Sequence, residues 1–527
     1  MNPAPSVHVV AVPHAMHKSV AMNLTRLIYK IAFERRYKQL ERYATKTPQI
    51  QQQQLRWLLS RYNSTIAGRD FGLLGDESIE EFQQKVPLMT YDRQKPYIER
   101  MLQGEENVLW PGLCKWFAKS SGTTSDKSKY IPVTDDALQL THYRGATDSM
   151  VIYLALNPSS RIMSGKGLIL GGSFSNESLP KGIHAGDLSA TLIQNVNPLV
   201  NYIRTPRKEV ALMSEWEEKL RQLCATTKDV NVTNLSGVPS WMLGVLRNIL
   251  AETGKQDITE VWPNLECFFH GGIAFTPYRE EYKKLIPSSK MHYLETYNAS
   301  EGFFGVQSSW DDSSLQLVID NRIFYEFIPM DEYDEDNPSM HAIPLSKVEI
   351  GRNYAMVITT PGLLRYIIGD TVRFTQRDPY KFAITGRTKA FINAFGEELM
   401  VSNADEALVK TCMETGASVA EYTAAPTFVE GNRKAHHSWI IEFSQAPADI
   451  ELFADLLDKH LQQVNSDYEA KRYKGIFLDR LDITIARPGL FTDWLKVKKG
   501  KLGGQIKIPR LSNSRQYLEE LTRMNQE

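Results

Sequence analysis

The stretch SSGTTSDKSKY, from Ser120 to Tyr130, gathers hydroxyl groups and positive charge in one short segment. Hydroxyls and backbone N–H groups can surround phosphate oxygens, and lysines such as Lys127 and Lys129 add point charge for the terminal phosphates. The spacing is not that of a Walker A loop, because Lys127 stands where the second glycine would be, counted from Gly122. These residues indicate either a phosphate-binding loop or a polar surface turn, which the same residue types also build.

A second candidate is HGGIAFTPYRE, which begins at His270 directly after a strand-like apolar run. Without side chains, Gly271 and Gly272 allow a flat ring to lie against the backbone at the end of a buried strand. An ordinary strand-to-helix turn would use the same residues. The segment alone favours the turn.

The third candidate is YNASEGFFG, which begins at Tyr297 after a predicted strand. Tyr297 offers an aromatic face for a purine, and Ser300 offers a hydroxyl. Glu301 is a reasonable ligand for Mg²⁺, which usually takes one or two protein carboxylates and shares its other positions with phosphate and water. Asn298 and Ala299 belong to the same predicted site. An aromatic core turn with a solvated glutamate is the open alternative.

The fourth candidate is LLRYIIGDTVRF, in which Asp370 follows a glycine at the end of an apolar strand. A carboxylate there can accept hydrogen bonds from both ribose hydroxyls, or it can bond to its own backbone as a turn residue. Arg387 follows Gly386 further along the chain and can reach a ribose or an α-phosphate. Each candidate is weak by itself, and the order of the series carries the information.

In this order the series resembles the adenylate-forming superfamily of acyl-CoA synthetases and firefly luciferase. It is more closely similar to the auxin-responsive acyl acid amido synthetase family, over roughly residues 50 to 512. The family patterns S-S-G-T-[TS]-S-G-K-S-K-x-x-P, Y-x-[AS]-S-E-G, Y-R-x-G-D, N-x-x-Y-x-x-K-R and G-Q-x-K-x-P-R are matched, respectively, by residues 120–132, 297–302, 366–370, 465–472 and 504–510. The last two separate this family from the acyl-CoA synthetases.

Two positions depart from these patterns. Asp126 stands where the family has glycine; aspartate tolerates left-handed backbone, but it adds negative charge near phosphates. Ile367 replaces the arginine of the Y-R-x-G-D pattern, and Arg365, two residues earlier, is a candidate to serve in its place.

The resemblance implies an ATP- and Mg²⁺-dependent ligase with two half-reactions. A small-molecule carboxylic acid first becomes an acyl-adenylate with release of pyrophosphate, and an amine, typically of an amino acid, then forms an amide and releases AMP. The residues implied as catalytic are Lys507, Glu301 and Lys127, with Glu301 also as the metal ligand. The residues implied in nucleotide binding are Ser120, Ser121, Gly122, Thr123, Thr124, Ser125, Lys129, Gly271, Gly272, Tyr297, Asn298, Ala299, Ser300, Asp370 and Arg387.

Two other functions stay open at this point: an acyl-CoA ligase that forms a thioester, and a non-catalytic protein that binds an acyl ligand or a nucleotide. The acid is expected between the Tyr297 segment and upstream helices. The candidate pocket side chains are Met150, Tyr153, Phe303 and Phe304, all of which are also ordinary core residues.

The elements that must position these residues follow from the apolar periodicity. Residues 22–73 show helical spacing, and short apolar runs from 109 to 382 predict a large mixed α/β domain with several sheets. Runs at 439–443, 450–472 and 481–486 predict a strand, a helix and a strand of a small, mobile α+β domain. We therefore expect an N-terminal ATP- and acid-binding domain at 1–385, a hinge at 386–398 and a C-terminal domain at 399–527.

Composition limits the remaining possibilities. The chain has 527 residues, which predicts more than one domain, and its 61 basic and 62 acidic side chains nearly cancel. We therefore expect neither nucleic acid nor membrane as a partner. The four cysteines are scattered, which favours a reducing cytoplasm over a disulfide scaffold. A monomer or weak homodimer is expected.

Overall fold

The computed structural model describes residues 24–526 apart from 121–128, 175–178, 274, 276–277, 335–339, 389–390, 398, 429–433, 474–476 and 500–508. Several predicted site residues therefore lie outside the described residues: Ser121, Gly122, Thr123, Thr124, Ser125, Lys127 and Lys507. The unusual Asp126 lies there too, and only the backbone of Ser120 is described.

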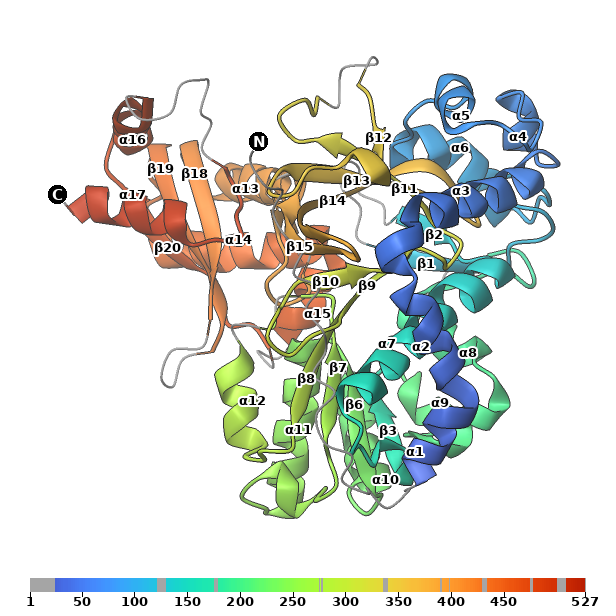
Figure 1. Ribbon diagram of the computed structural model, residues 1–527. Coiled ribbons are helices and arrows are strands. Elements are labelled where there is room, and N and C mark those ends of the chain that lie inside the picture. Colours follow the sequence, from blue (N-terminus) through green and yellow to red (C-terminus); the bar gives the residue numbers. More distant parts are fainter. Residues whose placement is uncertain are drawn as a thin grey trace, which may run out of the picture.

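The N-terminal part is helical, as the periodicity of residues 22–73 predicts, and its blue helices run along the right-hand side of Figure 1 from the bottom to the top. Leu55, Leu58 and Leu59 are buried and form the inner face of the longest helix, α3. The helices are α1 (Leu24–Ile28), α2 (Glu34–Glu41), α3 (Tyr43–Tyr62), α4 (Ile66–Asp70), α5 (Ile79–Lys85) and α6 (Tyr91–Leu102).

The centre is a twelve-stranded mixed sheet, in the order β12-β11-β13-β14-β15-β10-β9-β8-β7-β6-β3-β5. Neighbouring strands are antiparallel from β12 to β8 and parallel from β8 to β5. The strands are β3 (Lys166–Ile169), β5 (Arg204–Thr205), β6 (Val232–Gly237), β7 (Cys267–His270), β8 (His292–Ala299), β9 (Gly302–Gln307), β10 (Leu315–Leu317), β11 (Phe324–Pro329), β12 (Ile343–Pro344), β13 (Asn353–Thr360), β14 (Leu363–Arg377) and β15 (Tyr380–Arg387). The predicted α/β class is confirmed.

Helices cover both faces of the parallel half, as parallel strands require. On one face Phe268 stacks on Tyr282 of α12, and on the other Phe269 packs edge-on against Tyr153 of α7. The helices around this half are α7 (Tyr143–Leu156), α8 (Leu188–Asn195), α9 (Lys208–Ala211), α10 (Trp216–Thr227), α11 (Pro239–Thr253) and α12 (Arg279–Leu285).

A three-stranded sheet contains the residues on either side of the hydroxyl-rich segment. β1 (Trp116–Ser120) pairs antiparallel with β2 (Lys129–Pro132), and Ser120 lies opposite Lys129. β1 also pairs with β4 (His184–Gly186) in parallel.

The C-terminal part, orange to red in Figure 1, is an α+β unit with the sheet order β18-β19-β20. Its elements are β16 (Phe391–Ile392), β17 (Leu399–Met400), α13 (Val401–Thr415), β18 (Ser418–Thr427), β19 (His436–Gln445), α14 (Ile450–Val464), α15 (Ser466–Arg472), β20 (Asp482–Ala486), α16 (Leu490–Lys499) and α17 (Gln516–Gln526). The prediction of one helix over 450–472 is wrong. The helix is interrupted at Asn465, which caps the N-terminus of α15: its side chain accepts a hydrogen bond from the backbone N–H of Tyr468.

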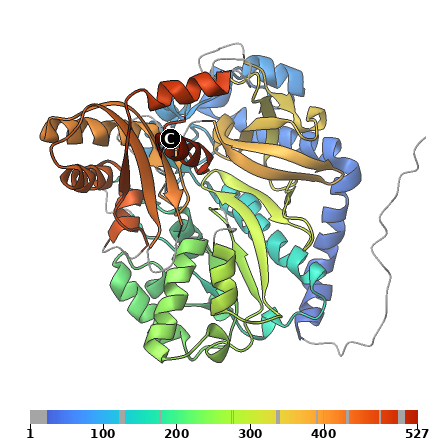
Figure 2. The same ribbon diagram turned by 90° about the vertical axis from the view of Figure 1, so that its left-hand side faces the viewer.

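The C-terminal unit packs on the parallel half of the large sheet, as Figure 2 shows from the side. The Tyr278 hydroxyl donates to the Ala394 carbonyl at 2.9 Å, and the rings of Trp241 and Phe477 stack at 6.2 Å. A continuous apolar cluster therefore joins the two parts. No helix among the described residues is long and apolar enough to cross a membrane.

Candidate functional site

A cavity of about 1670 Å³ lies between the large sheet, α7, α8 and the C-terminal unit. The structure describes the side chain, or the backbone in the case of glycine, of ten predicted site residues. All ten line this cavity: Lys129, Gly271, Gly272, Tyr297, Asn298, Ala299, Ser300, Glu301, Asp370 and Arg387. These residues come from β2, the end of β7, β8 and the turn after it, β14 and β15. Five segments that are distant in the sequence thus meet in one cavity, while the role of each residue stays a prediction.

The carboxylate of Asp370 is held by two neighbours. The Tyr297 hydroxyl donates to one of its oxygens, and the Arg387 Nε lies 2.7 Å from the other. Asp370 and Arg387 face each other in the β14–β15 register, so the backbone pairing itself sets this ion pair. An oriented carboxylate at the wall of a cavity suits a partner with paired hydroxyl donors.

Tyr297 is more deeply packed than a purine platform requires. Its ring lies 4.9 Å from that of Phe304 and 6.1 Å from that of Phe382, and only 7% of the residue is exposed. Burial raises the pKa of the Tyr297 hydroxyl well above its usual value, so it stays protonated and donates to Asp370. The geometry supports a positioning role for Tyr297, beside the purine contact that the sequence predicts.

Glu301 lies at the turn between β8 and β9 and faces the cavity. Burial raises the pKa of its carboxyl to about 7, and Asp370 adds to this, whereas Lys129 and Arg387 lower it. No cluster of three or more His, Cys, Asp or Glu side chains suited to a metal ion occurs in the described part of the chain. A cation at Glu301 would thus have one or two protein carboxylates and take its other oxygens from substrate and water, which fits Mg²⁺.

The glycine pair after β7 lines the cavity but also has a structural reason. A Cβ on Gly271 would lie 2.2 Å from the Thr296 carbonyl oxygen of the neighbouring strand. Gly272 has a φ of +84°, which side-chain-bearing residues rarely adopt. The pair is therefore required by the backbone, whether or not a ring lies against it.

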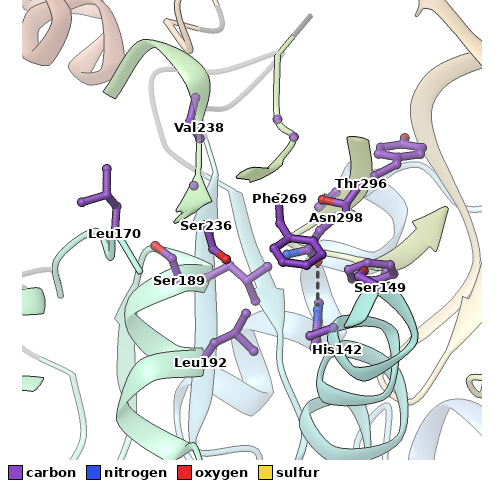
Figure 3. Close-up of a pocket in the computed structure, with 18 of the residues that line it drawn as sticks. His142, Ser149, Leu170, Ser189, Leu192, Ser236, Val238, Phe269, Thr296 and Asn298 are labelled. Carbon is purple, nitrogen blue, oxygen red and sulfur yellow. Dashed lines mark hydrogen bonds between the residues drawn. The ribbon is translucent and has the colours of Figure 1, made fainter. Parts of the chain in front are cut away.

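Beyond these residues the cavity continues between the sheet and two helices. Figure 3 shows His142 and Ser149 on one side facing Ser189 and Leu192 of α8 on the other, with Phe269 and Ser236 between them. His142 Nδ1 lies 3.2 Å from Asn298 Oδ1, and burial lowers the pKa of His142 to about 4, so the ring is neutral. The sequence analysis missed His142, since a lone histidine in a helix carries no motif.

The predicted acid-pocket side chains divide into two groups. Met150 and Phe303 line the cavity. Tyr153 and Phe304 have no exposed surface and belong to the apolar core. Alternation along β9 explains the difference between Phe303 and Phe304, since neighbouring residues of a strand face opposite sides.

Family models match most of the chain. The GH3 family N-terminal domain matches residues 36–291, the central domain 316–387 and the C-terminal domain 402–516. The chain belongs to the GH3 family. The predicted family membership is thereby confirmed, while the boundary proposed at 386–398 stays a prediction.

Similar proteins within the GH3 family include an indole-3-acetic acid-amido synthetase, GH3.8, of Oryza sativa subsp. indica, which is 25% identical over 89% of each chain. GH3.3 of Arabidopsis thaliana, of the same description, is 22% identical over 88% of this chain and 89% of the relative. Both names describe ligases that form amides, so the thioester-forming and non-catalytic alternatives are not favoured.

Solved structures share the fold. The structure of AtGH3.15 acyl acid amido synthetase in complex with 2,4-DB aligns with a TM-score of 0.59 and 19% identity, over 92% of this chain and 95% of that one. A 2-hydroxyisobutyryl-CoA ligase in complex with 2-HIB-AMP and CoA aligns with a TM-score of 0.55 and 14% identity, over 92% of each chain. At these identities the similarity establishes the architecture.

The GH3 pattern has an arginine where this chain has Ile367, and Arg365 was predicted to serve in its place. The structure contradicts this prediction. The Arg365 guanidinium is buried and forms a double hydrogen bond with Glu326, at 3.0 Å and 2.8 Å. It also donates to the Val86 and Gln83 carbonyls. Arg365 does not line the cavity, because its side chain anchors β14 to β11 and to the residues after α5.

The GH3 element at 465–472 has a local explanation. The Tyr468 hydroxyl and the Arg472 guanidinium both bind Asp458, at 2.7 Å and 2.8 Å. With α15 fixed in this way, Lys471 lies with its Nζ 4.0 Å from the centre of the Trp241 ring and lines the cavity. Asn465, Tyr468 and Arg472 thus fix the helix in place, and Lys471 reaches the N-terminal domain.

Proposed function

We propose that this GH3 protein activates a small-molecule carboxylic acid with ATP and transfers the acyl group from the adenylate to an amine. The observation that carries the proposal is the meeting of ten predicted residues in one cavity, with Asp370 oriented by Tyr297 and Arg387. In the first half-reaction the carboxylate attacks the α-phosphate and pyrophosphate leaves. In the second, the amine attacks the acyl carbon and AMP leaves.

The difficulty of the first step is charge, because an anion must approach a polyanion. Lys129, with the hydroxyl-rich segment that β1 and β2 bracket, would neutralise phosphate charge, and Asp370 would accept from the ribose hydroxyls. Glu301 would hold a Mg²⁺ ion, which would supply further neutralisation of the phosphates. Donors and charges that are already oriented act without reorganisation at the moment of reaction.

The second step needs positioning more than activation, since AMP is a good leaving group; holding two reactants in place supplies on the order of 7–11 kcal/mol. We propose that the C-terminal domain at 399–527 rotates about the hinge at 386–398 between the half-reactions, which brings Lys507 to the nucleotide for the first step only. The contacts of Trp241 with Phe477 and of Tyr278 with Phe428 join the two domains and support a docked arrangement, which the rotation would exchange for another.

For each of the two substrates we propose only a chemical class. The relatives are named for indole-3-acetic acid and for amide formation, and the similar structure holds 2,4-DB, so we propose an organic acid and an amino acid. The cavity lies within one chain, which is consistent with activity as a monomer or weak homodimer. The cysteines are free, which suits the cytoplasm.

The first prediction concerns the ribose contact. Asp370→Ala should raise the KM for ATP about 10- to 100-fold, because charge-assisted hydrogen bonds contribute about 1.5–3 kcal/mol. Tyr297→Phe keeps the Asp370 carboxylate but removes one of the two groups that orient it, so it should raise the KM for ATP less. Initial rates of acid-dependent pyrophosphate release at varied ATP measure both. An unchanged KM in Asp370→Ala would refute the ribose contact.

The second prediction concerns the lysine that the family pattern places at position 507. Lys507→Ala should slow pyrophosphate release by about 10²-fold and affect transfer from preformed acyl-adenylate much less, since the lysine acts on phosphate charge. Rapid-quench measurement of each half-reaction separates them. Equal losses in both would contradict this role.

The proposed function is tested by pyrophosphate release across a panel of carboxylic acids, followed by an amine panel with the best acid. Product analysis with coenzyme A in place of the amines separates thioester from amide formation. Absence of ATP–pyrophosphate exchange with every acid would refute the proposal.

A further inference from the structure

Arg204 is a buried cation without a partner for its terminal groups. It lies on β5, the edge strand of the large sheet, with 4% of its surface exposed. Its Nε donates to Asn201 Oδ1 at 2.7 Å, whereas Nη1 and Nη2 are buried and make no hydrogen bond. Burial lowers the pKa of Arg204, partly offset by Glu209, but a guanidinium stays charged in proteins. Such a group is costly to the folded state unless something binds it.

The side chain of Arg204 lines the same cavity as the predicted nucleotide site. Arg204 is in register with Gly167 of β3, which is in register with Asn234 of β6, so all three belong to the sheet face that carries the cavity. Gly167 leaves space there for the Asn234 amide, whose Oδ1 would lie 2.6 Å from a Cβ at position 167. This end of the cavity therefore has a polar wall with a positive charge whose terminal nitrogens have no hydrogen-bond partner.

Arg204 is far from the reacting atoms. Four strand-to-strand steps separate β5 from β8, which carries the Tyr297 segment, and steps of about 4.8 Å place β5 about 19 Å across the sheet. Between these ends the lining mixes apolar side chains such as Leu192 and Phe269 with the hydroxyls of Ser149, Ser189 and Ser236, as Figure 3 shows. Only an elongated molecule can occupy both ends.

The acid, not the amine, is the substrate placed to reach Arg204. Residues of the C-terminal domain, Asp467, Lys471 and Asn513, also line the cavity, and Lys471 lies against Trp241 at the start of α11. The described walls around Arg204 belong to the N-terminal domain, beyond the site where the acyl group is activated. An acyl chain that runs from the nucleotide towards β5 passes between the sheet and α8.

We propose that the acid substrate carries a second anionic oxygen group at its far end, in the simplest case a carboxylate, and that Arg204 binds it through Nη1 and Nη2. The geometry suits arginine, whose two terminal amino groups match the two oxygens of a carboxylate. This inference rests on the proposed function, because it names the substrate class of the same cavity.

The test compares straight-chain α,ω-dicarboxylic acids of increasing length with methyl-terminated acids of the same lengths, using ATP–pyrophosphate exchange, which needs no amine. The wild-type protein should prefer a diacid in kcat/KM. Arg204→Gln should lower kcat/KM for that diacid by at least about 30-fold, as truncating one partner of a buried charge pair does, and leave the methyl-terminated acids unchanged or improved. The exposed Arg207, three residues on, supplies the matched control Arg207→Gln, which should keep the wild-type preference.

Two exchange results would overturn the inference while leaving the proposed function intact: a wild-type protein without preference for diacids, or a preference that Arg204→Gln retains. An Arg204→Gln protein that is changed only in its KM for the amine would also overturn it, since Arg204 would then bind the second substrate.

Binding measured without turnover separates this inference from the proposed function. Addition of the diacid should raise the melting temperature of wild-type protein and of Arg207→Gln, but not that of Arg204→Gln. Without ligand, Arg204→Leu should melt no lower than wild type, because it removes an uncompensated buried charge. If no acid supports exchange, the proposed function fails, and the melting experiment with the diacid alone decides the role of Arg204. The inference is overturned if the diacid binds Arg204→Gln as well as it binds wild type, or if it does not bind wild type.

Discussion

Glu301→Gln should reduce acid-dependent ATP–pyrophosphate exchange by about 10²–10³-fold, the usual cost of removing one preorganised electrostatic group from a reaction centre. Glutamine keeps the size and hydrogen-bonding capacity of the side chain and removes its charge. The carboxylate is desolvated, so its charge acts across a medium that screens poorly. Exchange should also require more Mg²⁺ in the variant, because one of the few protein oxygens available to the ion carries no charge.

Glu295→Gln is the matched control for this experiment. Glu295 lies on β8, the strand that leads to Glu301, lines the same cavity and is also desolvated, since burial raises the pKa of its carboxyl. Without a place in the proposed nucleotide contacts, its neutralisation should change exchange little. Comparable losses in the two variants would show that general charge in the cavity, and not Glu301, supports the first half-reaction.

Glu326→Ala should destabilise the protein by about 3–5 kcal/mol, the typical cost of removing one partner of a buried ion pair. The Glu326 and Arg365 side chains are 1% and 5% exposed, and the truncation leaves the Arg365 guanidinium without its carboxylate. Gln83, which donates to Glu326 at 2.8 Å, loses its acceptor as well. The shift of the urea midpoint of the N-terminal domain measures this effect.

The double variant Glu326→Leu with Arg365→Met provides the complement. Replacing both members of a buried pair by apolar residues is often neutral or stabilising by about 1–4 kcal/mol. Its KM for ATP should stay that of the wild type, since Arg365 does not line the cavity. A raised KM for ATP in the folded double variant would show that Arg365 contributes to nucleotide binding.

Part of the site follows from sequence patterns because its residues stand at strand ends. Gly271 and Glu301 come just after the ends of β7 and β8, as the apolar runs before them predict. Asp370, which was expected at a strand end, lies inside β14, because that strand continues to Arg377. The order of these elements identified the family, so their convergence in one cavity was predictable without knowing the strand order.

Side-chain direction was less predictable. Arg365 and Asp370 lie on one strand, yet the first is buried against Glu326 and the second faces the cavity. Alternation puts two residues that are five positions apart on opposite faces, and what the sequence did not show is the buried Glu326 carboxylate that Arg365 meets. The pairing of β14 with β13 is also irregular, with register shifts around Val357 and Ile358. The positive φ of Arg365, 42°, marks the same irregularity.

Long-range pairing limits prediction in a different way. β5 contains only Arg204 and Thr205, too few residues for a periodicity, and it becomes a strand only because β3 pairs with it. His142 and Arg204 therefore carry no pattern in the sequence, although both line the cavity. The break at Asn465 is a smaller case, in which a side-chain cap interrupts an otherwise continuous helical periodicity.

The walls of the cavity are divided between two parts of the chain. The surface that we propose for the acid is built by α7, α8 and the parallel strands, whereas Lys471 and Asp467, which also line the cavity, belong to the C-terminal domain. With the acid and the amine placed as proposed, we expect mutations that alter the choice of acid and mutations that alter the choice of amine to fall in separate segments of the gene. Selection can change one preference without disturbing the other, and recombination at the boundary can combine them anew.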